Sequence, residues 1–569
     1  MQAYPTLNLA IDPKAMKYRF NWNAPILVSH HDPKTIFHAG NVLLKSTNGG
    51  INWEVISPDL TRNDTTKQGP GGKPFTNEGA GGENYNTIFY VAESKLDKEE
   101  IWTGSDCGLV QVTLNGGKTW NNVTPADLAE SQINSMEVSA FEKGTVYVSA
   151  TRYKFNDYNS YTYKTSDFGK TWTRINRGVK ADDFIKVIRE DTKNNNILYA
   201  GSERGFYLSS DAGNSWKPFQ LNLPIVPVTD LMIRDNDLVA STAGRAFWIL
   251  DDLSTLQQFA ETTTAQTVRL IKPKASYKYG GGSGWQANHP RQGENAPEGV
   301  ILDYFLPAVT EKDTLTLGVY DANGLLVRTY TNQKDTSYIK YPGGPSPTKM
   351  LSAEKGHNRF LWDIRTESVK PDVKNVFVYG DYRGYAVVPG NYKARLTLNN
   401  TSTETELTVL PNPTIQATEN EWAEQQKILS VIVAAISEMQ LAVNELRKVK
   451  KQLAHQTEIY KEVSNADTVV AEAKKLITAI DAWESIIVEG RIQNGQDVIN
   501  WPSKLNAEFF NIKSLADASD PRITQGVKNR LADLLIQWAA EKTKLHTLKQ
   551  SFNQYNTLFK EQQLDAIQF

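Results

Sequence analysis

The eight residues STNGGINW, at positions 46–53, occur almost unchanged three more times in the chain. The other copies are TLNGGKTW at 113–120, TSDFGKTW at 165–172 and SSDAGNSW at 209–216. All four share the pattern Ser/Thr-x-Asp/Asn-x-Gly-x-x-Trp, and a phrase that recurs in this way predicts a repeat architecture. The patterned residues are Ser46, Asn48, Gly50, Trp53, Thr113, Asn115, Gly117, Trp120, Thr165, Asp167, Gly169, Trp172, Ser209, Asp211, Gly213 and Trp216.

Each position of the phrase has a physical reason. The hydroxyl and the short polar side chain accept hydrogen bonds from nearby backbone N–H groups and close a tight turn. The glycine takes a positive φ at low cost, and the tryptophan provides a large apolar plate at the start of the next strand. The third position is Asp in two copies but Asn48 and Asn115 in the others, and an amide cannot act as a general acid. We therefore interpret the phrase as scaffold.

Short strand pairs precede each phrase, for example TIFHAGNVLLK at 35–45 and ILYAGSERGFYLS at 197–209. Strand, turn, strand, phrase and strand make up one blade of a β-propeller, and tryptophan spacings of 67, 52 and 44 residues bracket the usual blade period. The long first spacing is explained by a Gly-rich insertion at 66–86. A fifth unit at 237–253 keeps the strand pair and lacks the phrase, so we expect the propeller to end there.

The remainder of the chain changes character twice. Residues 261–299 are rich in Gly, Pro and Asn and predict a linker, and alternating strands over 300–413, with the hairpin turn DANG, predict an immunoglobulin-like sandwich. Residues 414–569 carry apolar stripes of helical period at 428–453, 466–487 and 521–559, which predict a three-helix bundle with Asp520 as the N-cap of the last helix. The predicted fold is multidomain and mainly β, with the blades at 1–260.

Composition excludes several classes of protein. The formal net charge is −2 over 569 residues and no basic stripe is present, which argues against nucleic acid as the partner. Cys107 is the single cysteine, so no intramolecular disulfide is possible. The first 25 residues lack the apolar core of a signal peptide, and we expect no membrane span.

The repeats resemble Asp-box (BNR) repeats, and the chain is similar to the bacterial sortilin/Vps10-like repeat proteins, in particular the exported Bacteroidetes proteins labelled BNR-repeat glycosyl hydrolases. The pieces that carry this likeness are SPDLTRND, ADDFIKVIRED, LYAGSERGFYLSSDAGNSW, GRAFWILDDL and GHNRFLWDIR. The resemblance implies export, an open rather than closed ring of blades, and a longer parent protein with further N-terminal blades and a signal peptide. Family members carry His before the GR of the last blade, where this chain has Ala243, which weakens any role for that loop.

Aligning the blades places one polar residue of each in equivalent turns, on the face opposite the Asp-box turns: Asn41, Asp106, Arg152, Glu203 and Arg245. Such a ring of polar groups predicts a ligand surface, which Tyr153, Tyr158, Tyr161, Glu78 and Glu83 would extend. The alternative is that these turns are simply solvated, as most loops are.

The preferred function is an exported protein that binds a protein, peptide or glycan on this face, with no cofactor and no metal. A glycoside hydrolase is the competing hypothesis, since two carboxylates across a groove are what that reaction needs. Asp106 and Glu203 are its candidates, although Glu83, Asp251 and Asp252 are equally eligible. A structural component of the cell envelope is the third. The cluster His30, His31 and Asp32 matches a polar turn better than a metal site.

Overall fold

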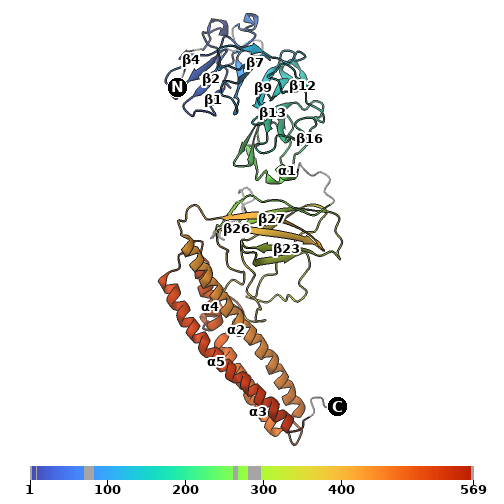
Figure 1. Cartoon of the computed structure of the whole chain (residues 1–569), viewed down its shortest axis with the longest axis vertical. Coiled ribbons are helices and arrows are strands. Elements are labelled where there is room, and N and C mark those ends of the chain that lie inside the picture. The colour runs from blue at the N-terminus through green and yellow to red at the C-terminus, as the bar shows by residue number, and fades with distance from the viewer. Residues whose placement is uncertain (1–2, 8, 70–81, 260–266, 280–296, 565–569) are drawn as a thin grey trace. The chain divides into compact units, whose positions relative to one another are not determined.

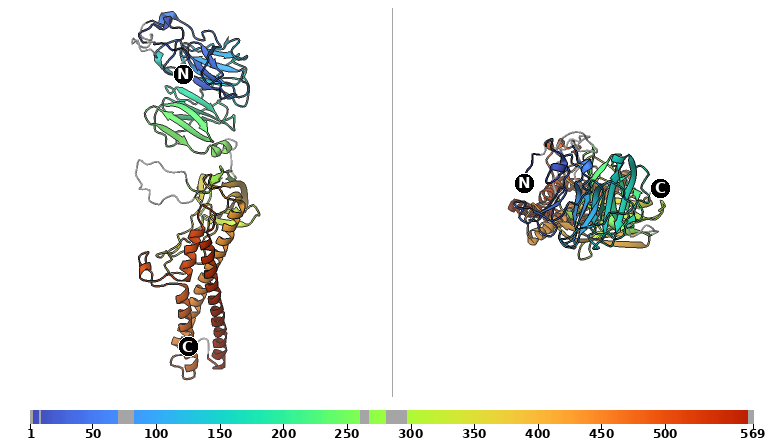
Figure 2. Two further views of the ribbon diagram at one scale, coloured as in Figure 1. Left: turned by 90° about the vertical axis from the view of Figure 1, so that its left-hand side faces the viewer. Right: turned by 90° about the horizontal axis from the view of Figure 1, so that it is seen from above.

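The computed structural model describes residues 3–7, 9–69, 82–259, 267–279 and 297–564, which form two compact units, Met1–Thr263 and Thr264–Phe569. Glu78, one of the predicted ligand residues, lies outside the described residues. Figures 1 and 2 show the first unit as a series of small sheets and the second as sheets followed by long helices.

The described residues of the first unit form five successive antiparallel sheets, called blades 1 to 5 here, and in each the strands follow one another in chain order. Blade 1 consists of β1 (Ile26–Val28), β2 (Ile36–Ala39), β3 (Leu43–Ser46) and β4 (Glu54–Val55), and blade 2 of β5 (Ile88–Glu93), β6 (Ile101–Ser105), β7 (Val110–Thr113) and β8 (Asn121–Asn122). Blade 3 consists of β9 (Gln132–Val138), β10 (Val146–Arg152), β11 (Asp157–Thr165) and β12 (Thr173–Arg174), and blade 4 of β13 (Ile185–Glu190), β14 (Leu198–Ser202), β15 (Phe206–Ser209) and β16 (Lys217–Pro218). Blade 5 has three strands, β17 (Val228–Arg234), β18 (Asp237–Thr242) and β19 (Phe247–Leu250). A short helix, α1 (Ser254–Phe259), follows blade 5.

Blades contact one another mainly through their first strands, since β5 lies against β9, β9 against β13 and β13 against β17. Separate apolar cores fill the spaces between consecutive blades: one core holds Trp102 with Val148, another Tyr147 with Trp216, and a third Tyr199 with Leu231. Four-stranded meanders that pack face to face around their first strands are the arrangement of β-propeller blades, as the repeats predict.

The second unit begins with two sheets that share one apolar core. One has the order β20-β22-β25 and the other β21-β27-β26-β23-β24. The core takes Leu302 and Trp362 from the first sheet and Leu317 and Leu396 from the second. The strands are β20 (Arg269–Leu270), β21 (Ser276–Tyr277), β22 (Val300–Leu306), β23 (Leu315–Tyr320), β24 (Leu326–Thr331), β25 (Gly356–Trp362), β26 (Gly390–Leu398) and β27 (Thr401–Leu410). Strands β20 and β21 lie within the predicted linker at 261–299 and are part of these sheets.

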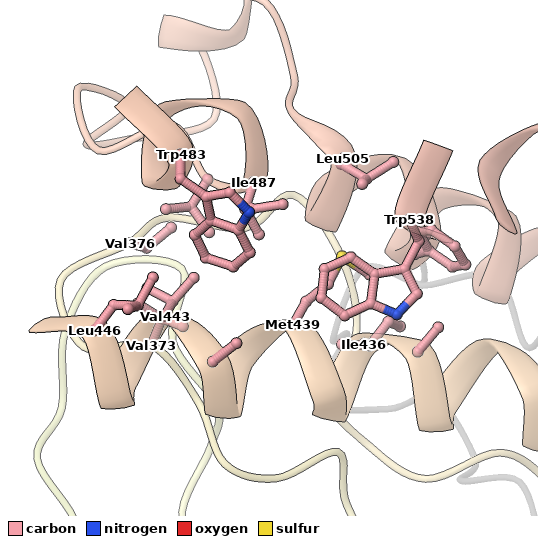
Figure 3. Packing of buried hydrophobic residues seen from close by; sticks show 14 of the residues in the cluster. Val373, Val376, Ile436, Met439, Val443, Leu446, Trp483, Ile487, Leu505 and Trp538 are labelled. Carbon is pink, nitrogen blue, oxygen red and sulfur yellow. The ribbon is translucent and has the colours of Figure 1, made fainter. Parts of the chain in front are cut away.

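Four helices follow, where the sequence predicted three: α2 (Glu419–Tyr460), α3 (Asp467–Ile487), α4 (Leu505–Ala516) and α5 (Gln525–Glu561). They share one apolar core with the segment 369–382, and in Figure 3 Trp483 and Trp538 point into it above Met439 and Val443 of α2. The prediction of Asp520 as an N-cap was wrong. The cap of α5 is Thr524, whose hydroxyl accepts from Val527 N, while Asp520 bonds to Arg522.

Among the residues that the structure describes, one helix, α2, is long and apolar enough by length and composition to cross a membrane, which the sequence did not lead us to expect. Four of its apolar residues, Leu429, Ile432, Ile436 and Val443, are fully buried in the helical core, whereas Val431 and Leu441 are exposed. Its apolar stripe is thus occupied by packing within the second unit.

Candidate functional site

The four Asp-box turns have the same hydrogen bonds whether the acidic position is Asp or Asn. In the third copy, Thr165 Oγ1 accepts from Gly169 N at 3.0 Å, and Asp167 Oδ1 accepts from Thr171 N at 2.9 Å. In the second copy, the amide oxygen of Asn115 accepts from Thr119 N at the same distance of 2.9 Å. The pKa of Asp167 falls to about 2, chiefly because the Thr171 hydroxyl donates to its carboxylate. A permanently charged carboxylate that is replaceable by an amide suits a turn and not a general acid.

The tryptophans of the boxes join consecutive blades. The indole N–H of Trp120 donates to the carbonyl of Ile56 at 2.9 Å, that of Trp172 to Val123 at 2.7 Å and that of Trp216 to Ile175 at 2.7 Å. Each acceptor belongs to the preceding blade, just after its fourth strand. Trp53, in blade 1, donates instead to Gly50 of its own box at 3.1 Å.

The turns opposite the boxes hold the predicted ligand residues. The backbone amides of Asp106, Glu203 and Ala243 donate to Thr87, Phe184 and Pro227, each just before the first strand of its own blade. This repeated bond shows that the three turns are structurally equivalent and lie at one end of the blades.

Two of the predicted ligand residues are buried and bonded inside the unit. Asn41 is 6% exposed, accepts from Arg19 N and donates to Asp59. Asp106 is 5% exposed and accepts from both the amide and the hydroxyl of Thr87. Both side chains hold together turns of the scaffold.

Burial raises the pKa of Asp106 to about 7, although the bonds from Thr87 oppose the shift. The folded state therefore binds more protons than the unfolded state between about pH 4 and pH 7, so this group makes stability fall as pH rises through that window. We expect Asp106→Asn to leave stability unchanged near pH 4 and to raise it by about 1–3 kcal/mol near pH 8, because the amide oxygen still accepts from Thr87 N. Calorimetric unfolding of wild type and variant across this range measures the difference, and a variant that is less stable at the higher pH would contradict the prediction.

Other predicted residues form local contacts. Arg152 bonds to Asp157 and to the carbonyl of Glu130, and the hydroxyl of Tyr161 donates to the same Asp157. Glu83 pairs through its backbone with Asn21. Arg245 is exposed on the blade 5 turn, where its guanidinium donates to the carbonyl of Gly244.

Three further predicted residues, Tyr153, Tyr158 and Glu203, line one hollow of about 800 Å³ between blades 3, 4 and 5, whereas Asp251 and Asp252 are not among its lining residues. We call it the aromatic hollow, and its other lining residues are Asp182, Phe184, Lys186, Arg204, Ile225, Val226 and Pro227. The ring of Tyr153 is stacked on that of Phe184 with centroids 5.7 Å apart, and Tyr158 lies 6.4 Å from the same ring. Tyr153 and Tyr158 are 39% and 48% exposed, so they present aromatic surface to solvent.

Both carboxylates of the aromatic hollow are paired with cations. Glu203 lies 2.5 Å from Lys186 Nζ, and Asp182 lies 3.0 Å from the guanidinium of Arg204. Sequence reasoning did not select Phe184, Lys186, Asp182 or Arg204. The available signal was their position in the blade. Asp182, Phe184 and Lys186 lie around the start of the first strand, as Thr87 does in blade 2, and Arg204 lies in the turn that corresponds to that of Asp106.

The predicted polar turn at 30–32 is part of the junction between blades 1 and 2. His30 N donates to Glu93, His31 Nε2 lies 2.8 Å from the carbonyl of Ser94, and Asp32 accepts from Lys34 N and from the Thr35 hydroxyl. Among the residues that the structure describes, no group of three or more His, Cys, Asp or Glu side chains is placed to hold a metal ion.

No family model and no curated protein matches the sequence. Among solved structures, the chain is similar to the Niastella koreensis GH74 enzyme, with 14% identity over 40% of this chain and 34% of that chain and a TM-score of 0.31. It is similar to the GH74 xyloglucanase from Xanthomonas campestris, with 15% identity over 51% of this chain and 42% of that chain and a TM-score of 0.32. It is also similar to the β-propeller domain of Myceliophteria thermophila Cps50, with 10% identity over 41% of this chain and 67% of that chain and a TM-score of 0.27. The chain spans less than half the length of the two glycoside hydrolases. At these values no activity or ligand is transferred to this chain, and the resemblance to sortilin-like proteins stays a prediction.

Proposed function

We propose that the first unit binds a glycan in the aromatic hollow without cleaving it. The observation that supports this most is the combination of two half-exposed tyrosine rings and two ion pairs around one cavity of about 800 Å³. Ligand sites in proteins are typically concave, with aromatic walls and a few polar groups that fix orientation. Flat aromatic surface suits the C–H faces of a sugar ring, and the ion-paired groups offer donors and acceptors for its hydroxyls.

A peptide is a less suitable ligand for this hollow. An extended peptide is usually held by an open strand edge or by a groove of one charge. Here the cations and carboxylates alternate as Lys186–Glu203 and Arg204–Asp182, so the hollow has no excess of either sign. A neutral, hydroxyl-rich ligand matches that balance.

Glycoside hydrolysis is the second candidate, because the hollow does contain two carboxylates, Asp182 and Glu203. A hydrolase needs one of the two to be protonated near neutral pH so that it can donate to the leaving oxygen. Both carboxylates here are instead engaged in ion pairs, Glu203 with Lys186 at 2.5 Å and Asp182 with Arg204 at 3.0 Å. The pairing therefore favours binding over cleavage.

The test is a panel of oligosaccharides and peptides assayed for both affinity and product. We expect saturable glycan binding without product, and a loss of affinity of about five- to thirtyfold for Tyr153→Ala or Tyr158→Ala, since each removes a ring worth about 1–2 kcal/mol. Tyr279→Ala, which removes a 52% exposed ring from the second unit, is the matched control and should leave affinity unchanged. Product formation that Glu203→Gln abolishes would make the protein a hydrolase instead.

We further propose that the protein is exported, on the resemblance of its repeats alone. Cys107, the single cysteine, is buried, so an oxidising compartment meets no exposed thiol. Fractionation of expressing cells with an antibody against the chain would decide this, and recovery in the cytosolic fraction alone would reject export.

A further inference from the structure

The interior blades of the first unit are buried on both faces, and the two end blades are not. Every residue of β6 and β14, the second strands of blades 2 and 4, is buried. The second strands of blades 1 and 5, β2 and β18, alternate between buried and partly exposed residues. Alternation of this kind marks a sheet that is covered on one side only. Within the described residues, blades 1 and 5 each leave one face uncovered.

The open face of blade 5 is apolar. Met232, Val239 and Ile249 stand side by side across its three strands, because β17 pairs Met232 with Val239 and β18 pairs Val239 with Ile249. Phe247 lies two residues from Ile249 on the same side of β19. Met232, Phe247 and Ile249 are 63%, 75% and 59% exposed, which is far more than single surface hydrophobics require.

The open face of blade 1 is apolar at its first strand. Ile26 and Val28 of β1 are 71% and 51% exposed, and they stand opposite His38 and Ile36 of β2. Phe20 stacks on His38 and covers the middle of this face, which leaves the first strand uncovered. In blades 2 to 4 the equivalent face packs on the preceding blade through the box tryptophan, whereas Trp53 bonds within its own box.

We propose that blade 5 of one copy of this chain packs against blade 1 of a second copy. The chain itself contains this type of contact between each consecutive pair of blades, and in every case the face that a blade gives to its successor meets the opposite face of that successor. In blades 1 to 4, one face packs on the next blade along the chain, and in blade 5 this same face is uncovered. In blades 2 to 5, the opposite face packs on the preceding blade, and in blade 1 that face is uncovered. The open face of blade 5 and the open face of blade 1 are therefore of the two kinds that pack together within the chain. Two copies of the same open face are not.

This contact joins different surfaces of the two copies, so it either closes a ring of two chains or extends further. It covers Ile26 and Val28 with the row Met232, Val239 and Ile249, and it brings β1 beside β17. First strands are also where consecutive blades touch within the chain. The proposal does not depend on the ligand of the aromatic hollow.

The experiment compares the molar mass in solution of the full chain and of two variants, measured by light scattering after size exclusion. At up to about 100 µM chain, it detects association with a dissociation constant of about 100 µM or lower. We expect the wild type to be a dimer or larger, and Ile249→Asp or Ile26→Asp to be monomeric, because each places a charge in one of the two faces. Leu114→Asp, a charge introduced at a 46% exposed position in the box turn of blade 2, is the matched control and should assemble as the wild type does.

Mixing the two variants distinguishes the proposed contact from others. Each variant keeps one intact face, so an equimolar mixture should form a heterodimer through the remaining Ile26 face and Ile249 face. A monomeric wild type at the highest concentration would overturn the proposal. Assembly of Ile26→Asp by itself would overturn it too, since that result indicates pairing of blade 5 with blade 5.

Discussion

Trp216→Ala is expected to destabilise the first unit by about 3–5 kcal/mol, the usual range for removal of a large buried aromatic side chain. Trp216 is 2% exposed and packs with Tyr147 and Ile188 in the core between blades 3 and 4. Its indole N–H also donates to the carbonyl of Ile175 in blade 3, so truncation leaves a cavity and removes one of the two donors to that carbonyl, which still accepts from the Thr162 hydroxyl at 3.2 Å. Calorimetric unfolding of the full chain measures the loss.

The same substitution in blade 1 is the internal control. Trp53 is only partly buried and its indole bonds to Gly50 of its own box, so it joins no preceding blade. We expect Trp53→Ala to lower stability by less than half as much as Trp216→Ala. Equal losses would mean that the tryptophan matters for closing its own turn, which would contradict its role as a link between blades. Trp216→Phe separates the two contributions, because it keeps most of the packing and should lose about 1–2 kcal/mol for the hydrogen bond.

The box turns could be predicted from the sequence because their bonds are local. Thr165 reaches Gly169 and Asp167 reaches Thr171, each four residues along the chain, so the pattern alone determines the contacts. The links between blades could not be predicted in this way. Trp172 donates to Val123, 49 residues earlier, and nothing in the eight-residue phrase indicates that carbonyl.

Alignment of the blades indicated the end of the unit where the aromatic hollow lies, but it did not distinguish side chains that face solvent from side chains that turn inward. Glu203 and Asp106 occupy equivalent turns, and only Glu203 lines the hollow. Asp106 turns inward because Thr87 supplies two donors just before β5, whereas Phe184 occupies the equivalent position of blade 4 and supplies an aromatic ring. In these two blades, the residue before the first strand thus distinguishes a turn whose side chain bonds inward from one whose side chain lines the hollow.

The helical part shows a different limit. The long apolar stripes of α2 and α3 have a clear period, whereas α4 spans only 12 residues, between the predicted stripes at 466–487 and 521–559. A short helix leaves little periodic signal, and much of its stability comes from packing. Phe509 and Phe510 are fully buried in the helical core, and Gly380 lies so close to Phe510 that a Cβ there would meet its side chain at 2.8 Å. Residues that hold α4 therefore come from α2 and α5 and from a segment more than 100 positions earlier.

At the end of α4, Asp517→Ala is expected to destabilise the second unit by about 3–5 kcal/mol, the usual result of removing one partner of a buried ion pair. Asp517 is 8% exposed, lies 2.5 Å from Arg365 Nη1 and accepts from Ala386 N at 2.9 Å. It thereby joins the helices to the segment after β25. Its charge also favours protonation of two buried lysines, Lys513 and Lys278.

Because of Lys278, we expect Asp517→Ala to lower the free energy of unfolding by more than the loss of the ion pair with Arg365 alone would. Burial lowers its pKa to about 8, and its Nζ lies 4.4 Å from the ring centre of Trp422. Without Asp517 the site would hold Arg365, Lys513 and Lys278 with less compensating negative charge, and a buried cation is costly when it is unpaired. We expect the variant's deficit to shrink as pH rises toward about 8 and to level off above it, because without Asp517 the pKa of Lys278 is lower still, so Lys278 loses its proton in the variant before it does so in the wild type.

Two further variants separate the electrostatic explanation from simple disruption of α4. Asp520→Ala removes a carboxylate three residues later that is 40% exposed and paired with Arg522, so it should change stability by no more than about 0.5 kcal/mol. The double variant Arg365→Met with Asp517→Leu removes both charges and fills the space with apolar atoms, which is often neutral for buried pairs. We therefore expect the double variant to recover at least half of the stability that Asp517→Ala loses. A double variant as unstable as the single one would show that the geometry of the Ala386 bond, and not the unpaired charge, holds this junction together.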